Sequence, residues 1–252
     1  MKKLVLATTI AVLTSAYAQA DSYQVEIGAT YGQSETGSFE SDIYTLDGEV
    51  FFAEVDTSKG SLAEASFLDK ASGLGLTYAT TSPETGDSVD AWATGLRVVT
   101  GGDLIIEASY ADSDDDSAFG IGIGTYLNDN TDIVVSYETA DEADLDTLAV
   151  DLHSVVSLSG DSSLAYNVGA SYIDANDSGY GIAGELTYYV NNNLGFGGVV
   201  GYTSVGDSDL TTFGVKADYF VNSTIRLRAM YSTAEANSFD TDTFTLGASA
   251  RF

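Results

Sequence analysis

The residue types of this sequence limit the chemistry that the chain could perform. His153 is the one histidine and there is no cysteine, so thiolate metal sites, disulfides and sites with two imidazoles are excluded. Asp151 precedes His153 by two residues, which in an extended chain puts both side chains on one face, where the carboxylate could orient the imidazole. No serine stands in the sequence context of a hydrolase nucleophile. We therefore expect His153 to be a hydrogen-bonded wall residue and the protein not to be an enzyme.

Two further patterns resemble ligand sites but lack residues that such sites need. Residues 112–116 are rich in aspartate, which suits a hard cation, yet the spaced acids, glycine and closing glutamate of an EF-hand loop are missing. Glycines alternate over residues 120–124 with no helix pattern after them, so a nucleotide-binding loop is not indicated. We predict no cofactor and no defined metal site. The 112–116 run is interpreted as a solvated acidic loop that could bind divalent ions loosely.

Composition and charge indicate which elements would have to position these residues. The chain has 252 residues, of which 44% are hydrophobic, and this argues against disorder. Its 38 acids and 9 bases give a formal net charge of -29, which excludes a nucleic-acid partner because phosphates would be repelled. A single proline beside 26 glycines suits a chain made mostly of strands and tight turns.

The N-terminus has the pattern of a secretory signal peptide. Lys2 and Lys3 precede an apolar run over residues 4–13, and Ala18-Gln19-Ala20 ends the segment, so cleavage is expected before Asp21. A helical membrane anchor is the alternative, but about ten apolar residues are too few to cross roughly 30 Å of hydrocarbon. The predicted organisation is a signal peptide over residues 1–20 and a mature domain over residues 21–252.

From Ser22 onward the apolar residues recur at every second position, which indicates strands. The predicted strands cover residues 22–32, 42–54, 71–80, 89–99, 104–111, 118–127, 132–140, 146–158, 164–173, 179–190, 194–205, 210–220, 225–234 and 242–252. The one competing helix pattern runs from Leu62 to Lys70. Strands of this number and spacing predict an all-β, antiparallel up-and-down transmembrane barrel of about 14 strands, within a range of 12 to 16.

The connections between the predicted strands fall into two alternating classes. Tight turns rich in Gly, Asn, Asp and Ser occur at residues 100–103, 128–130, 159–163, 191–193 and 221–224. Longer loops with acids but no Lys or Arg occur at residues 33–41, 81–88, 111–117, 140–145, 174–178, 206–209 and 235–241. Hairpins with two chemically different ends are typical of outer-membrane barrels.

Aromatic residues on the apolar face support the same interpretation. One group lies near the loop ends: Tyr31, Tyr78, Trp92, Tyr110, Phe119, Tyr172, Tyr180, Tyr202, Phe213, Tyr231 and Phe244. A second group lies near the turn ends: Tyr23, Tyr166, Tyr188, Tyr219 and Phe252. Two aromatic girdles are expected where a barrel crosses two membrane interfaces. A soluble β-sandwich is the alternative, and it would explain neither the girdles nor the segregated loops.

The end of the chain carries a family resemblance. Residues 244–252 alternate strictly and finish on Phe252, and they resemble the last strand of Gram-negative outer-membrane proteins, which the barrel-assembly machinery recognises. Residues 55–68 (VDTSKGSLAEASFL) resemble a segment of small porins of marine Gram-negative bacteria. The resemblance implies a porin of the cell outer membrane, a passive water-filled channel for small hydrophilic solutes and ions. Phe252 would be its assembly signal, and outer-membrane lipid and lipopolysaccharide its surroundings.

The chain differs from the large trimeric porins in the length of its predicted connections. Those porins have a long third loop folded into the lumen, whereas no connection here exceeds residues 55–70, which fall at the turn end. A monomer and a homotrimer therefore both stay open. Residues 55–70 are expected to form a short helix or a fold-back at the periplasmic mouth, because Leu62, Ala65, Phe67 and Leu68 need covering.

The face opposite the apolar one is expected to line the lumen. Its acids are Glu26, Asp47, Glu49, Glu107, Glu138, Asp151, Glu185 and Asp218, its bases are Arg97, Lys216, Arg226, Arg228 and Arg251, and it includes His153. Most bases fall on the last three predicted strands, so the lumen would have a transverse field. Acids exceed bases, which predicts weak cation preference. Alternatively, Arg251 on the last strand simply pairs with Glu26 on the first.

Two other functions remain open on sequence alone. A substrate-specific outer-membrane channel would share every feature described and differ only in a few lumen contacts. A structural or adhesive barrel without an open pore would need bulky or paired interior residues. Glycines at inward positions such as Gly122, Gly169 and Gly197 favour a water-filled interior.

Overall fold

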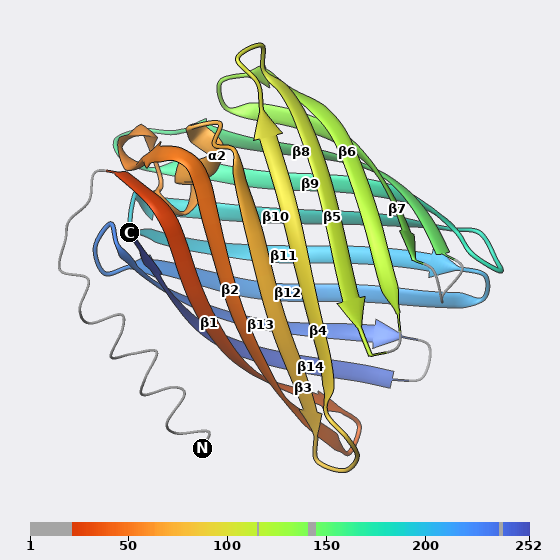
Figure 1. Ribbon diagram of the computed structural model, residues 1–252. Helices are drawn as coiled ribbons and strands as arrows, with labels where there is room; N and C mark the ends of the chain where they lie inside the picture. The colour runs from red at the N-terminus through yellow and green to blue at the C-terminus, as the bar shows by residue number, and fades with distance from the viewer. Residues whose placement is uncertain (1–21, 115, 141–144, 237–238) are drawn as a thin grey trace.

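The structure is a computed structural model that describes residues 22–114, 116–140, 145–236 and 239–252. Its 14 strands form one closed barrel (Figure 1). The strands are β1 Ser22–Thr36, β2 Phe39–Asp56, β3 Gly73–Pro83, β4 Val89–Val99, β5 Leu104–Ser113, β6 Ser117–Asn128, β7 Thr131–Ala140, β8 Leu145–Ser157, β9 Ser163–Asp174, β10 Gly179–Asn191, β11 Leu194–Val205, β12 Ser208–Phe220, β13 Ile225–Ala236 and β14 Phe239–Arg251. Every pairing is antiparallel, and all except the closing pair of β1 with β14 join neighbours in the sequence, which confirms the predicted up-and-down topology.

The barrel closes where the first strand meets the last. β1 pairs with β14 in a register that sets Glu26 opposite Arg251 and Thr36 opposite Thr241. The backbone N–H groups of Gln24 and Val25 both donate to the carbonyl oxygen of Phe252, at 2.7 and 3.0 Å. The end of the chain is therefore hydrogen-bonded into the seam, and the barrel has no open sheet edge.

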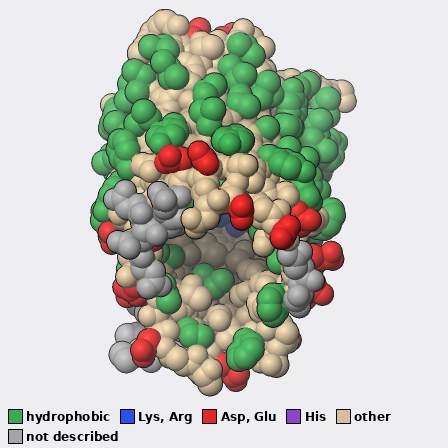
Figure 2. Space-filling view, turned by 90° about the vertical axis from the view of Figure 1, so that its right-hand side faces the viewer, with side chains coloured by type: hydrophobic (Ala, Val, Ile, Leu, Met, Phe, Trp, Pro, Cys, Tyr) green, Lys and Arg blue, Asp and Glu red, His purple; other side chains and the backbone are tan. Residues whose placement is uncertain are grey.

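The outer wall is apolar because successive side chains on a strand point to opposite faces. Large outward-facing side chains remain exposed along the strands, as Val215 (63%), Ile123 (60%) and Leu76 (57%) illustrate. Figure 2 shows such side chains covering the flank of the molecule. So large an apolar surface would be unfavourable in water, whereas it is what a membrane-spanning barrel presents to lipid. Within the described ranges, no helix has the length and apolar character needed to cross a bilayer.

The loop end is built differently from the long acidic loops that the sequence predicted. β1 and β2 are joined by residues 37–38 alone, with Gly37 at φ 62°, and β11 and β12 by residues 206–207. Glu35 lies within β1 and pairs with Glu40 of β2 and Asp242 of β14. The strands extend further because a polar strand can be hydrated on both faces outside the bilayer. Figure 2 shows acidic side chains around the hollow at this end.

Some predicted features lie outside the described residues. They are the signal peptide over residues 1–20, Asp115 of the acidic run, and residues 141–144 and 237–238 of two acidic connections.

The turn-end girdle requires one correction. Tyr23 is only 3% exposed, because a β-bulge between Tyr23 and Val25 reverses the alternation and turns the Tyr23 side chain inward. There it packs edge-on against Phe51, with ring centroids 5.4 Å apart. The outward exposure of Tyr188, Tyr219 and Phe252 agrees with the predicted positions.

Residues 57–72 connect β2 to β3 and form the inward segment. It contains two 3₁₀ turns, η1 (Thr57–Lys59) and η2 (Leu62–Glu64), and the single-turn helix α2 (Ala65–Leu68). The segment lies at the end of the barrel that holds the C-terminus, beside the label α2 in Figure 1. Both sequence expectations for this region hold together, since it is a short helix within a fold-back at the turn end.

Candidate functional site

Buried aromatic rings at the turn end of the lumen provide the apolar surface that the inward segment packs against. Three strands carry two aromatics in succession, of which the first-named is buried at 1–3% exposure and the second is exposed to 45–57%: Phe51 and Phe52, Tyr189 and Tyr188, Phe220 and Tyr219. In each pair the exposed ring belongs to the outer wall and the buried ring points inside. Buried rings inside a barrel need an apolar partner. Leu68 supplies one, packing with Val155, Ala165 and Tyr189.

Hydrogen bonds attach the inward segment to strands around the barrel. The Arg251 guanidinium donates through Nη1 to the Leu62 carbonyl at 2.8 Å, and the Leu62 N–H donates to the Asn192 carbonyl at 2.8 Å. The Tyr126 hydroxyl donates to the Phe67 carbonyl at 2.9 Å. These contacts come from β14, the β10–β11 turn and β6, so the segment is held from widely separated parts of the wall.

Glu64 of the inward segment contacts two side chains of the wall. Its Oε1 accepts a 2.7 Å hydrogen bond from the Tyr189 hydroxyl, and its Oε2 lies 3.1 Å from Nε2 of His153. Burial alone would raise the pKa of Glu64, but the hydrogen bond and charge of His153 and the bond from Tyr189 outweigh it and hold the pKa below its ordinary value. The His153 ring also stacks on Phe67, with centroids 4.0 Å apart. His153 is thus a wall residue that binds the segment.

Lys70 ties the end of the segment to two turns. Its Nζ lies 2.8 Å from Oδ1 of Asp103 and 3.2 Å from Oδ1 of Asp129. These hydrogen bonds, led by the one to Asp103, raise the pKa of Lys70 above its ordinary value. The contact joins the β4–β5 and β6–β7 turns to the segment at the rim.

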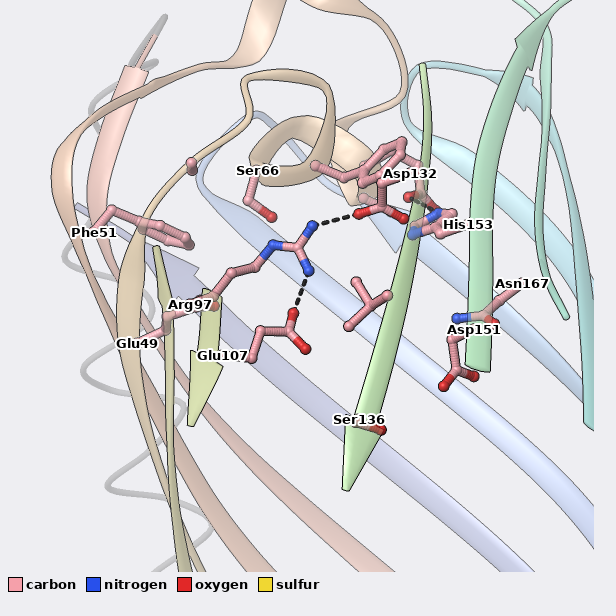
Figure 3. Close-up of a pocket in the computed structure, with 15 residues that line it drawn as sticks. Glu49, Phe51, Ser66, Arg97, Glu107, Asp132, Ser136, Asp151, His153 and Asn167 are labelled. Carbon is pink, nitrogen blue, oxygen red and sulfur yellow. Dashed lines mark hydrogen bonds and ion pairs between the residues drawn. The ribbon is translucent and has the colours of Figure 1, made fainter. Parts of the chain in front are cut away.

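On the loop side of the inward segment lies a space lined by polar side chains, which we call the central chamber. It consists of two adjoining cavities of about 440 and 600 Å³, which share Glu49, Arg97, Glu107 and Ser136 in their walls. Figure 3 shows the Arg97 guanidinium between Glu107 and Asp132, with Ser66 of the inward segment beside it. The walls come mainly from β2 to β9.

Each predicted lumen base is paired with an acid. Arg97 is bound to both Glu107 and Asp132, and Lys216 to Glu185. The other three pairs join Arg226 Nη2 to Asp218 Oδ1 at 2.5 Å, Arg228 Nη2 to Asp47 Oδ1 at 3.5 Å, and Arg251 Nε to Glu26 Oε2 at 2.7 Å. The positive charge expected on the last three strands is therefore largely neutralised by acidic side chains next to it.

Three carboxylates of the chamber are left without such a partner. Among the described residues, no basic side chain forms an ion pair with Glu49, Glu138 or Asp151. Asp151 lies over Gly169, where an added Cβ would be 2.4 Å from Oδ1, so a side chain at this position would displace the carboxylate. Since Arg97 is itself bound to two acids, these three carboxylates add to a chamber wall whose acids outnumber its bases. Within the same described ranges, no three His, Asp or Glu side chains form a set able to hold a metal.

The structure corrects two of the predicted pore-lining residues and adds others. Arg251 and Asp218 are buried and line neither cavity of the chamber; Arg251 instead stacks over Tyr23 and Phe220 and joins the seam to the inward segment. Asp132 binds Arg97 in the chamber wall; it is the first residue of the predicted strand 132–140 but was not counted among the lumen acids. Its even-numbered alternation with Glu138 was the available signal. Glu64 had no periodic pattern to reveal it.

Taken together, a closed antiparallel barrel, an apolar outer wall, a polar interior and an acidic mouth define an outer-membrane channel protein. The family model described as "putative general bacterial porin" matches residues 1–139 and 127–252. The chain belongs to this porin family, and its place is the outer membrane of Gram-negative bacteria.

A solved structure of an outer-membrane protein shows the same fold. The outer membrane protein Omp33 of Acinetobacter baumannii superposes with a TM-score of 0.71 at 24% identity, covering 93% of this chain and 100% of that one. OccK7 (OpdD) of Pseudomonas aeruginosa gives a TM-score of 0.48 at 9% identity, covering 92% of this chain and 98% of that one. No curated protein sequence matches the chain.

Proposed function

We propose that the protein is a passive, water-filled channel for small hydrophilic solutes and ions, with a preference for cations, and that it is not an enzyme. The observation that carries the proposal is the central chamber, a polar space inside a closed barrel whose bases are all paired and whose Glu49, Glu138 and Asp151 are not. Unpaired carboxylates in a space with low-dielectric walls concentrate cations. The acidic rim adds to the same effect at the mouth.

The inward segment sets the size limit of the proposed channel. It occupies the turn end of the lumen, where Leu62, Ala65 and Leu68 are buried against the wall. A solute that passes the chamber must then pass beside this segment or displace it. We therefore expect a low conductance and a small size limit for solutes. The second candidate function is a barrel that the segment closes tightly and that opens only when the segment leaves the lumen.

Liposome swelling tests the proposed channel directly. Vesicles loaded with the refolded protein should swell in small sugars and amino acids, at rates that fall steeply with solute size, and a cationic solute should enter faster than an anionic one of the same size. A refolded barrel with its lumen blocked by a covalent cross-link provides the control for leakage around the protein. Swelling no faster than the control in every solute would contradict the open channel and favour closure by the inward segment.

The remaining proposals concern processing and assembly. We propose that residues 1–20 are a signal peptide and that Phe252 is part of the signal read by the barrel-assembly machinery, since its ring is exposed on the outer wall while its carbonyl completes the seam. The barrel wall is complete within one chain, which holds equally for a monomer and for each subunit of a homotrimer, so both states stay open. Cross-linking in native membranes would distinguish the two states.

A further inference from the structure

An apolar groove interrupts the outer wall over β9, β10 and β11. It has a volume of about 670 Å³, and its rim and floor include Tyr166, Val168, Leu186, Tyr188, Phe196 and Val200. The groove opens outward, because Val168, Leu186, Phe196 and Val200 belong to the exposed face of their strands, each at more than half exposure. It is separate from the lumen and continuous with the lipid-facing wall.

Two glycines create the groove. Gly184 of β10 pairs with Val200 of β11, and Gly198 of β11 pairs with Leu186 of β10, so the missing side chains are next to each other on one face. A Cβ built on Gly184 would have nothing nearer than the Val200 Cγ2 at 3.7 Å, and one on Gly198 nothing nearer than the Gly214 carbonyl at 3.4 Å. Close packing of the barrel therefore does not require glycine at either position, and their effect is the empty space outside the wall.

Two tyrosines on the rim have free hydroxyl groups. Tyr166 and Tyr188 belong to the turn-end girdle, and in the described part of the chain neither phenol donates to or accepts from a protein group. At the loop-end girdle, by contrast, the Tyr202 hydroxyl donates to Asp209 at 2.9 Å and the Tyr231 hydroxyl to Asp242 at 2.8 Å. The groove thus combines an apolar floor with two unused hydrogen-bond donors at the periplasmic interface.

We propose that this groove holds one phospholipid of the periplasmic leaflet, with an acyl chain on the glycine floor and its polar head near Tyr166 and Tyr188. The inference rests on the outer-membrane location and not on conduction through the lumen. Continuity with the lipid-facing wall makes acyl chains the surrounding medium. A second barrel is a poor occupant, since two convex walls meet along a narrow line and leave a groove unfilled. A flexible chain fills it.

Photocross-linking tests the site. The refolded protein is reconstituted in vesicles that contain phosphatidylethanolamine with a diazirine on one acyl chain, and adducts are mapped by peptide mass spectrometry. We expect adducts to concentrate on residues 184–200, compared with the wall around Ile106, Ile121 and Ile123, which has similar exposure but no outward-facing glycine. Replacing Gly184 and Gly198 with valine fills the floor, and losing the burial of about two methylene groups is enough for roughly a tenfold drop in adducts.

Matched variants separate the site from general lipid exposure. Gly48→Val adds the same side chain to an outward-facing glycine, where the nearest atom to a Cβ is 3.9 Å away and there is no comparable groove, and it should leave adducts at residues 184–200 unchanged. Tyr166→Phe with Tyr188→Phe should lower them with the fold intact. Uniform labelling around the barrel, or protein–protein cross-links across β10 in place of lipid adducts, would overturn the proposal. The wild-type adduct map decides the question even if the valine variant does not fold.

Discussion

The ionisable residues of the lumen act according to whether they have a partner. Glu49, Glu138 and Asp151 face the central chamber without an ion pair, whereas Arg97 is shared between two acids. Sequence alternation was sufficient to place all three unpaired acids on the inward face, because parity on a strand is strict. It anticipated one neutralised pair, Arg251 with Glu26 at the seam, but not the others, since pairing depends on cross-strand register and on side chains such as Glu64 that no periodic pattern marks.

Neutralising the three unpaired carboxylates should reduce the cation preference of the channel. In a variant with Glu49→Gln, Glu138→Gln and Asp151→Asn, we expect the zero-current potential in a salt gradient to fall by about half or more, with conductance retained. Glu84→Gln, which alters an acid at the loop end outside the chamber, serves as the control and should have a much smaller effect. An unchanged potential in the triple variant would place the selectivity elsewhere.

The attachment of the inward segment to the barrel wall should weaken at acid pH, because Glu64 becomes protonated. Because its pKa is lowered in the folded state, the contact stabilises docking fully above the ordinary value of 4.5 and loses this stabilisation as pH falls through the folded pKa. Channel recordings should therefore show larger or more frequent openings as pH drops below about 4.5. Glu64→Gln should give the same behaviour already at neutral pH. A variant with the wild-type pH response would show that another group controls docking.

Arg251 is predicted to stabilise the seam and not to select ions. Arg251→Met leaves the buried Glu26 carboxylate unpaired and the Leu62 carbonyl without its donor, so we expect a loss of about 3–5 kcal/mol in the free energy of unfolding. The measurement is urea unfolding of the refolded barrel in lipid vesicles. Adding Glu26→Gln should recover part of the loss, and a single variant as stable as wild type would rule out the structural role.

The strands and the inward segment differ in how well the sequence predicts them. The membrane enforces alternation on each strand, and the predicted strands agree with the 14 observed. Beyond the bilayer this constraint ends, so the loop predicted over residues 33–41 was too long. For the inward segment, the helix pattern from Leu62 to Lys70 and its apolar residues predicted a short helix or a fold-back, but no periodic pattern showed which strands it would contact.

Replacing the inward segment should enlarge the channel. If residues 57–72 are exchanged for a short Asn-Gly turn, the turn end loses its filling, and single-channel conductance should rise about severalfold as the pore widens. Phe51, Tyr189 and Phe220 would then be exposed to water, so we also expect lower stability. Heat-modifiable gel mobility verifies that the variant is folded. Conductance equal to that of wild type in the folded variant would mean that the segment does not limit flow.

The whole molecule has an uneven distribution of charge, with acids at the loop end and paired charges inside. Salt screens the exposed rim over roughly 8 Å at physiological ionic strength, whereas the chamber carboxylates are less accessible to screening. Selectivity should therefore weaken as salt rises without disappearing.

Single-channel recording of the refolded protein, residues 21–252, in a planar bilayer tests the central claim most directly. The zero-current potential is measured in the same experiment under a salt gradient at low and high ionic strength. We predict discrete steps of low conductance and a potential of the sign given by cation preference, larger at low salt. Silence from protein confirmed as folded, or a potential of the opposite sign, would contradict a cation-preferring channel through the central chamber.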